Sequence, residues 1–248
     1  MTTHDVAHYD AHAAAMRNLD FFYVWMRETV ERYVARDAAI CDVGCGTGAL
    51  LHELAAAGYT QLAGTDFSAG CLALAARNAP GALLLTHDIC AAPLPTQYDA
   101  LVLACVLDFL PEPQRALNNL RASLRPGGRL LLHFRNRQAY WPWYHLRHVF
   151  ARLPAGRVRH WALHFSTPLG LRRSDQPFER VYAPAEIRAL LAHAGLQPVA
   201  RAGAMMLPMV WLPELPTLVH ALARAERPFR QLPPWRRHYQ LLYVCETP

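Results

Sequence analysis

The sequence of 248 residues contains no lysine, so all 25 of its basic side chains are arginine. Its formal net charge of +6 would ordinarily favour a nucleic-acid partner. A chain rich in alanine whose only basic side chain is arginine, however, is as typical of coding bias as of selection for charge. We therefore give the charge little weight and do not expect nucleic acid to be the partner.

Two kinds of hydrophobic segment are also missing. Met1–Asp5 is not a basic stretch followed by an apolar run, so no export signal is indicated. No charge-free apolar run approaches the about 20 residues that span a bilayer. We expect a soluble, cytoplasmic protein without a transmembrane segment. The apolar stretch 205–218 leaves contact with a membrane or a lipid open, although core packing is the preferred interpretation.

Paired Cys-x-x-Cys spacing is absent as well. The six cysteines fall mostly within expected strands and helices, which indicates reduced thiols and neither a zinc site nor a disulfide framework. His160 and His164 have a spacing that suits one face of a helix, but no carboxylate close by completes a ligand set. We expect no metal.

Short apolar runs alternate with helical patterns from residue 38 onward. This rhythm predicts a parallel sheet with right-handed crossovers, and the nearly continuous apolar run Tyr98–Cys105 is typical of a central strand covered on both faces. Pro184 and Gly195 bound a later helix. The expected strands are 38–42, 61–65, 81–86, 98–105, 129–134, 196–202 and 239–245, and the expected helices are 49–58, 68–78, 113–124 and 185–194.

The remaining segments have a different character. Apolar residues spaced by three and four predict one amphipathic helix within 10–35, ahead of the first strand. Two later segments, one rich in arginine, tryptophan and histidine and one broken by prolines, interrupt the alternation. We expect a single domain made of an N-terminal lid helix (1–37), a core (38–134), two cap insertions (135–182 and 204–238) and two pieces that complete the sheet (183–203 and 239–246).

The stretch Asp42-Val43-Gly44-Cys45-Gly46-Thr47-Gly48 follows the first apolar run. Alternate glycines let the backbone take positive φ and leave room for a ligand against the main chain. The helical pattern behind the loop places a helix N-terminus beside it. The sequence therefore predicts a ligand site here.

The spacing Asp42-x-Gly44-x-Gly46-x-Gly48 resembles the first motif of class I S-adenosylmethionine (SAM)-dependent methyltransferases, of the small-molecule, UbiE/UbiG-like type. Asp66 ends the second strand where that family places the acidic residue that accepts both ribose hydroxyls, and Phe67 would flank the adenine. Asp88 and Ile89 follow the third strand where family members hold the adenine. Arg125-Pro126-Gly127-Gly128 before the fifth strand is also typical of the family.

The resemblance implies a Rossmann-like α/β fold, a seven-stranded mostly parallel sheet with helices on both faces, with SAM as cofactor and S-adenosylhomocysteine (SAH) as product. Tyr9 and Arg17 stand where related enzymes aim such side chains at the methionine carboxylate, and a solvated helix turn is the alternative for both. For Cys45 and Cys105 a purely structural role stays open. The expected cofactor-binding residues are Tyr9, Arg17, Asp42, Gly44, Cys45, Gly46, Gly48, Asp66, Phe67, Asp88, Ile89 and Cys105.

The glycine loop differs from the dinucleotide-binding pattern. Nicotinamide enzymes use G-x-G-x-x-G, but here the third glycine comes one residue early and Asp42 precedes the loop. A non-catalytic domain or a relict interaction protein is disfavoured because the glycines, Asp66 and Asp88 are all present. We therefore expect a methyltransferase.

The acceptor is expected beyond the carboxyl ends of the strands, near 105–108 and 133–136. In-line methyl transfer needs alignment and water exclusion. If a general base is used, His133 is the first candidate, and the alternatives are His145, His148, His160 and His164. We expect an O or N atom of a small, aromatic or apolar metabolite as acceptor. An RNA- or other macromolecule-directed enzyme is the alternative, although 104–109 lacks the Asn/Asp-Pro-Pro-Tyr/Phe segment of base-amine methylation. Oligomeric state is left open.

Overall fold

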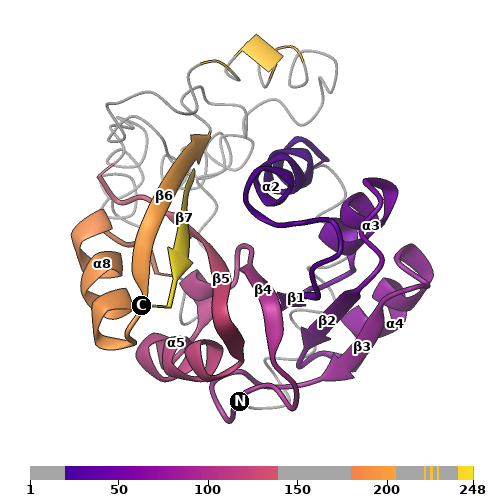
Figure 1. The fold of residues 1–248 in the computed structure, drawn as a ribbon, viewed down its shortest axis with the longest axis horizontal. Helices are drawn as coiled ribbons and strands as arrows, with labels where there is room; N and C mark the ends of the chain where they lie inside the picture. Colours follow the sequence, from indigo (N-terminus) through magenta and orange to yellow (C-terminus); the bar gives the residue numbers. More distant parts are fainter. Residues whose placement is uncertain are drawn as a thin grey trace, which may run out of the picture.

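The structure is a computed structural model that describes residues 20–138, 180–204 and 240–247, together with the single positions 221, 224, 225 and 228. Most of the expected cap insertions and residues 1–19 of the expected lid lie outside the described residues. The described residues form one seven-stranded sheet of order β3-β2-β1-β4-β5-β7-β6 (Figure 1). The strands are β1 Ile40–Val43, β2 Leu62–Asp66, β3 Leu83–Thr86, β4 Tyr98–Leu103, β5 Leu124–Arg135, β6 Gln197–Ala204 and β7 Gln240–Glu246.

The direction of the strands confirms the mostly parallel, Rossmann-like sheet. Strands β1 to β5 pair in parallel, and β7 alone runs antiparallel, inserted between β5 and β6. The sequence predicted all seven strands but not this insertion, which depends on long-range pairing. The strand order changes direction between β1 and β4. Open α/β sheets bind ligands beyond the carboxyl ends of the strands at such a point.

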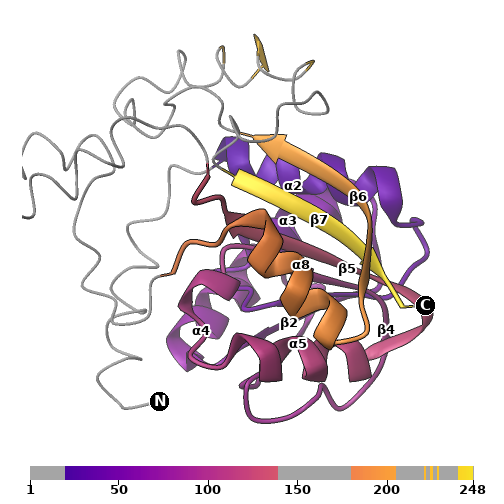
Figure 2. The same cartoon turned by 90° about the vertical axis from the view of Figure 1, so that its left-hand side faces the viewer.

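Helices cover both faces of the sheet, as the sequence predicted (Figures 1 and 2). Two core clusters, one on each face of the sheet, show which helices cover that face. Alternate residues of β4 point to opposite faces. Val102 packs with α2, α3 and α4, and Leu101 packs with α5 and α8. The helices are α2 Asp20–Tyr33, α3 Ala49–Ala56, α4 Ala69–Asn78, α5 Pro113–Ala122 and α8 Pro184–His193, and a 3₁₀ turn, η1, spans Leu107–Phe109.

The fifth strand begins earlier than expected. The predicted turn Arg125–Gly128 lies within β5, because Leu124 already pairs with Tyr98 of β4 before the register shifts and resumes at Ala100. Such an irregularity accommodates extra residues on one strand of a pair, and Gly127 takes a φ of 73° there. The expected turn is therefore an irregularity within the strand, and β5 pairs with β4 on both sides of it.

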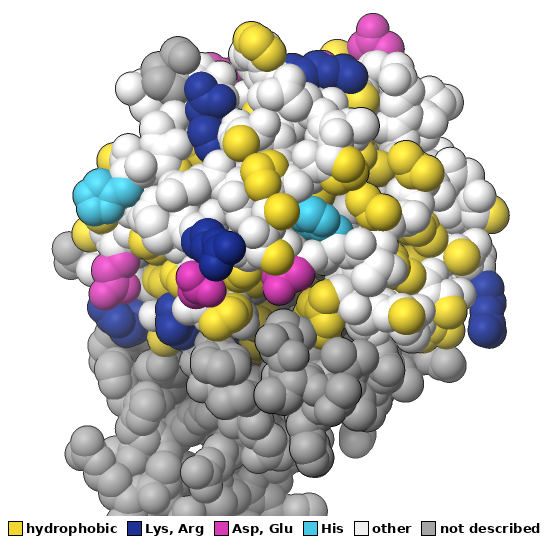
Figure 3. All heavy atoms as spheres, turned by 90° about the horizontal axis from the view of Figure 1, so that it is seen from below, with side chains coloured by type: hydrophobic (Ala, Val, Ile, Leu, Met, Phe, Trp, Pro, Cys, Tyr) yellow, Lys and Arg dark blue, Asp and Glu magenta, His cyan; other side chains and the backbone are white. Residues whose placement is uncertain are grey.

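Several of the described arginines of the surface are paired with acidic side chains. Arg115 lies 3.7 Å from Glu112, and Arg137 lies 2.6 Å from Glu186. On the face shown in Figure 3, some dark-blue arginine side chains lie next to magenta acidic ones and others stand apart from them. Within the described part of the chain, no helix has both the length and the hydrophobicity to cross a membrane.

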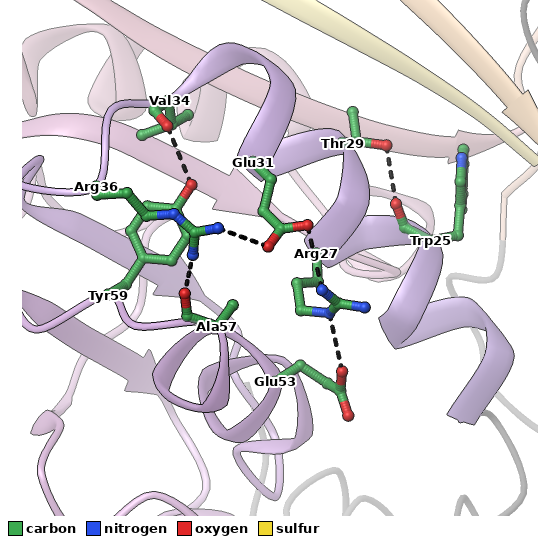
Figure 4. Close-up of polar contacts among 9 residues, drawn as sticks. All are labelled: Trp25, Arg27, Thr29, Glu31, Val34, Arg36, Glu53, Ala57 and Tyr59. Atoms are coloured by element: carbon green, nitrogen blue, oxygen red, sulfur yellow. Dashed lines mark hydrogen bonds and ion pairs between the residues drawn. The ribbon is translucent and has the colours of Figure 1, made fainter.

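Helix α2 is fixed to α3 by a small network of ion pairs (Figure 4). Arg27 of α2 contacts Glu31 of its own helix and Glu53 of α3, each at 3.1 Å. Arg36 approaches Glu31 at 2.8 Å from the other side. Partly exposed pairs of this kind contribute about 0.2–1 kcal/mol each, so buried apolar contacts supply most of the stability. The network sets the orientation of α2, which carries Tyr23 to a cavity described below.

Candidate functional site

The glycine loop connects β1 to α3 and turns on three residues with positive φ. Gly44, Gly46 and Gly48 have φ values of 73°, 51° and 78°. The loop is anchored to the neighbouring strand because the N–H groups of Gly44 and Cys45 both donate to the carbonyl oxygen of Thr65, at 2.7 and 2.9 Å. The loop is therefore a fixed turn rather than a loose connection.

The space around these glycines shows which side of the loop is open. A Cβ atom on Gly44 would lie 2.4 Å from a Val106 methyl group, and one on Gly48 would lie 3.0 Å from Ala75. A Cβ atom on Gly46 would meet nothing within 4 Å. Gly44 and Gly48 thus allow close packing of protein on protein, whereas Gly46 faces the open side.

Asp42, the last but one residue of β1, brings a carboxylate under this loop. Its side chain is buried, and its Oδ1 atom has no hydrogen-bond partner among the described residues. Burial raises the pKa of Asp42 from its ordinary 3.8 to about 7, and the negative charge of Asp66 adds to the rise. A buried oxygen without a partner beside a second carboxylate favours a positively charged ligand.

Asp66 ends β2 and organises the start of the next helix. Its Oδ2 atom accepts the N–H of Gly46 and its Oδ1 atom accepts the N–H of Ser68, both at 2.9 Å. Ser68 in turn caps α4 by accepting the N–H of Cys71 at 3.0 Å. Because a carboxylate oxygen accepts more than one hydrogen bond, Asp66 can hold the loop and still receive hydroxyl groups.

Asp88 and Ile89 follow β3 and form the third part of the site. Asp88 is exposed, and its Oδ1 atom accepts the N–H of Cys90 at 2.9 Å. Ile89 is buried, and its carbonyl oxygen accepts a hydrogen bond from Asn119 of α5 at 2.7 Å. The turn after β3 is thereby tied to the helix layer beneath it.

The ends of β4 and β5 supply the opposite wall. Asp108 is buried, and its Oδ2 atom lies 2.7 Å from Nε of Arg135. The guanidinium carbon of Arg135 lies 5.5 Å from the centre of the Phe109 ring, a cation–π distance. The pair joins two neighbouring strand ends and keeps Phe109 at the wall.

These parts enclose one cavity of about 260 Å³ at the carboxyl ends of the strands. Its position matches the general rule for open α/β sheets. Residues from the glycine loop, from the ends of β2 and β3, from the segment after β4 and from α2 line it: Tyr23, Asp42–Thr47, Asp66, Phe67, Cys71, His87–Ile89, Ala104–Val106, Asp108–Pro111 and Arg135.

Comparison with known proteins shows which family this sequence resembles. Residues 41–132 match the family described as a methyltransferase domain. Residues 41–132 therefore carry a methyltransferase domain of the class I SAM-dependent type. It is 28% identical over 153 residues to a demethylmenaquinone methyltransferase of Renibacterium salmoninarum, an alignment that covers 60% of this chain and 59% of that one. It is 26% identical over 191 residues to a ubiquinone biosynthesis O-methyltransferase of Bordetella bronchiseptica, covering 72% of this chain and 69% of that one.

The alignment with the first of these relatives thus spans less than two thirds of the relative's length. A solved structure agrees on the fold: magnesium protoporphyrin IX methyltransferase of Synechocystis PCC 6803 with bound SAH superposes with a TM-score of 0.61 at 16% identity, over 93% of this chain and 84% of that one. The methyltransferase fold that the sequence predicted is therefore confirmed, and the matched domain family indicates SAM as the cofactor.

The residues of this methyltransferase fit SAM on the structure's own evidence. SAM carries a sulfonium and an ammonium group, and the cavity presents the unpartnered oxygen of buried Asp42. The open side of Gly46 leaves space against the main chain. Asp66 and Asp88 stand at successive strand ends, at one edge of the same cavity.

The structure brings most of the predicted cofactor residues of the methyltransferase together. Gly48 shapes the loop but is not part of the cavity lining, and Tyr9 and Arg17 lie outside the described residues. The roles assigned to individual residues stay predictions. Those that line the cavity are Asp42, Gly44, Cys45, Gly46, Asp66, Phe67, Asp88, Ile89 and Cys105.

The geometry argues against His133 as a general base. Its side chain is buried and lies outside the cavity lining, and both ring nitrogens have protein partners: Nδ1 accepts the N–H of Cys105 at 3.0 Å and Nε2 lies 2.5 Å from Oε1 of Gln240. Burial lowers the pKa of His133 to about 3, so the ring stays neutral. The other candidate, His145, lies outside the described residues.

Sequence reasoning missed Tyr23 and Phe109, which both line the cavity. Asp108 and Arg135 lie within the two segments near which the acceptor was expected, but their contact was not foreseen because it requires β4 and β5 to be neighbours. No signal in the sequence indicated Tyr23, because its position depends on how α2 packs.

Proposed function

We propose that the protein transfers the methyl group of SAM to an oxygen or nitrogen atom of a small aromatic or apolar acceptor, and that the chain works as one methyltransferase domain. One observation carries the proposal. The cavity continues from the glycine loop to a wall formed by Phe109, Leu110 and Pro111 after β4, and Tyr23 of α2 also lines it. Apolar and aromatic walls with few polar groups are typical of small-molecule sites.

Residues of this chain would hold the cofactor at three points. In this proposal the glycine loop and Asp42 bind the methionine end, Asp66 receives the ribose hydroxyls, and Asp88 with Ile89 borders the adenine. Bound SAM supplies a methyl group already activated by the positive sulfur. The protein then contributes alignment and exclusion of water.

His133 is not part of the proposal as a base, and His145 stays the candidate for that role. Asp108 is ion-paired with Arg135, with Oδ2 2.7 Å from Nε. We propose that this pair holds the wall that the acceptor contacts, and that an acidic phenol or a neutral amine serves as acceptor without a base among the described residues.

The names of the two aligned relatives support an aromatic acceptor. One is a demethylmenaquinone methyltransferase and the other a ubiquinone biosynthesis O-methyltransferase, so both are named for quinone compounds. A small molecule is favoured over RNA because some of the arginine side chains on the face in Figure 3 lie next to acidic ones. Ion pairs such as Arg137–Glu186 occupy part of the positive charge.

We also propose that the protein works in the cytoplasm. All six cysteines are free in the structure, and burial raises the pKa of Cys245 to about 12. Buried, protonated thiols are stable in a reducing compartment. Fractionation of the producing cells tests this, and recovery of the protein outside the cytoplasm would contradict it.

A methyl-transfer assay tests the proposed activity. The purified protein is incubated with methyl-labelled SAM and, separately, with a panel of phenols, hydroquinones and aromatic amines or with total RNA. We expect label in at least one small acceptor and none in RNA, and Asp66→Ala should reduce the labelling at subsaturating SAM. Label in RNA but in no member of the panel would replace this proposal with a macromolecule-directed activity.

A further inference from the structure

Cys105 has an unusual backbone for a residue with a side chain. Its φ is 58°, and within the ranges that the structure describes it alone combines a side chain with a positive φ. L-residues avoid this region because the Cβ atom crowds the backbone. Cys105 lines the cavity directly after β4. A strained residue at a ligand site persists only when its surroundings hold it there.

Two side chains from neighbouring strands hold it. The N–H of Cys105 donates to Nδ1 of His133 on β5 at 3.0 Å. An imidazole nitrogen that accepts from a backbone N–H carries no proton, so the proton of the neutral ring sits on Nε2 and is donated to Oε1 of Gln240 on β7, at 2.5 Å. Gln240 therefore fixes the tautomer that Cys105 requires.

The ring of His133 has no freedom to turn away from this arrangement. It is fully buried and packs edge-on against Phe22 and Trp25 of α2, with ring centroids 4.9 and 6.2 Å apart. On β5 its neighbours Leu132 and Phe134 belong to the core cluster of the opposite face. His133 thus lies in the α2 face of the sheet, behind the cavity wall.

We propose that His133 is a positioning residue for the SAM site: with its tautomer set by Gln240, it holds Cys105 in the left-handed conformation that shapes the cavity wall. His133 acts through Cys105 and contacts neither SAM nor the acceptor. The inference rests on the SAM site proposed above. It adds that the last strand of the sheet, β7, contributes to cofactor binding through a residue outside the cavity.

The first experiment compares two replacements of His133 by isothermal titration of SAM. His133→Asn retains an acceptor oxygen near the position of Nδ1 and should bind SAM with about wild-type affinity. His133→Gln carries its amide further out and leaves the N–H of Cys105 without an acceptor. We expect its dissociation constant for SAM to rise about 5- to 30-fold.

A second substitution separates positioning from general damage to the core. Glycine adopts a positive φ without strain, so Cys105→Gly added to His133→Gln should restore SAM affinity. Cys105→Ala is the matched control, because it also removes the thiol but keeps the Cβ atom, and it should restore nothing. A merely structural role of His133 predicts that neither substitution changes SAM affinity in the His133→Gln background.

Two results would overturn the inference: wild-type affinity in His133→Gln, or a double variant with Cys105→Gly that binds as weakly as His133→Gln alone. If His133→Gln does not fold, Gln240→Leu and its combination with Cys105→Gly give the same comparison. Nitrogen NMR of the wild-type imidazole adds a direct readout, and a proton found on Nδ1 of His133 would also overturn it. Failure of the wild type to bind SAM would refute the proposed site itself, whereas wild-type binding with unaffected variants refutes only the positioning role.

Discussion

Replacing Asp42 by asparagine should stabilise the protein and weaken SAM binding at the same time. The carboxylate is buried with Oδ1 unpartnered among the described residues, and it faces the charge of Asp66. An asparagine has nearly the same shape but no charge to desolvate. Asp42→Asn therefore removes an electrostatic cost from the unliganded protein and an attraction from the complex.

The size of the effect follows from the shift in the pKa of Asp42. Its pKa is 3.8 ordinarily and about 7 in the folded protein, a difference of about three units or about 4 kcal/mol. Because the folded pKa is the higher one, the folded state binds the extra proton. The favourable contribution is full below pH 3.8, falls as the pH rises, and is lost above about pH 7.

Urea unfolding at pH 5 and at pH 8 measures this dependence. Between these values the free energy of unfolding of the wild type should fall, relative to Asp42→Asn, by about 3 kcal/mol, since about two pH units of the transition are crossed. Asp99→Asn is the matched control, because the N–H of Ala39 and the Arg125 side chain lower the pKa of Asp99 and its replacement should instead reduce stability at pH 8.

The same variant should bind SAM more weakly by about 1–3 kcal/mol at pH 8, because a charge-assisted contact to a cationic ligand is lost. Isothermal titration gives this value directly. An Asp42→Asn variant that gains no stability relative to the wild type between pH 5 and pH 8, or that binds SAM as the wild type does, would refute the reasoning.

Three further predictions concern neighbouring residues. Asp66→Ala should weaken SAM binding by about 1–3 kcal/mol in a calorimetric titration, since the hydroxyl groups it receives lose their partner, and unchanged affinity would remove Asp66 from the site. Gly44→Ala should reduce the free energy of unfolding by about 1–3 kcal/mol more than Gly46→Ala does. Both glycines take a positive φ, but only a Cβ atom on Gly44 would have a close neighbour. Equal losses in urea unfolding would contradict this. Arg135→Met should reduce stability by about 3–5 kcal/mol, because buried Asp108 loses its ion pair with Arg135. The double variant Arg135→Met with Asp108→Asn should recover part of that loss. Additive losses would argue against coupling between the two residues.

Local motifs carried the part of the fold and site that the sequence could predict. The alternating apolar runs determined seven strands, and the spacing of Asp42, the glycines, Asp66 and Asp88 indicated one loop and two strand ends. Each of these features depends on a few consecutive residues, so the chain displays it without knowledge of tertiary pairing.

Features that depend on strand order could not be predicted. Nothing in the sequence placed β7 between β5 and β6, so the contact of Gln240 with His133 was not foreseen. The Asp108–Arg135 pair likewise requires β4 and β5 to be neighbours. His133 was correctly placed at the end of a strand, but the face to which it points determined its surroundings.

A crystal structure of the protein with SAH tests the central claim most directly. We expect SAH in the cavity between the glycine loop and Cys105, with the ribose at Asp66 and the adenine beside Asp88. SAH bound elsewhere on the chain, or a cavity that stays empty at saturating SAH, would contradict it.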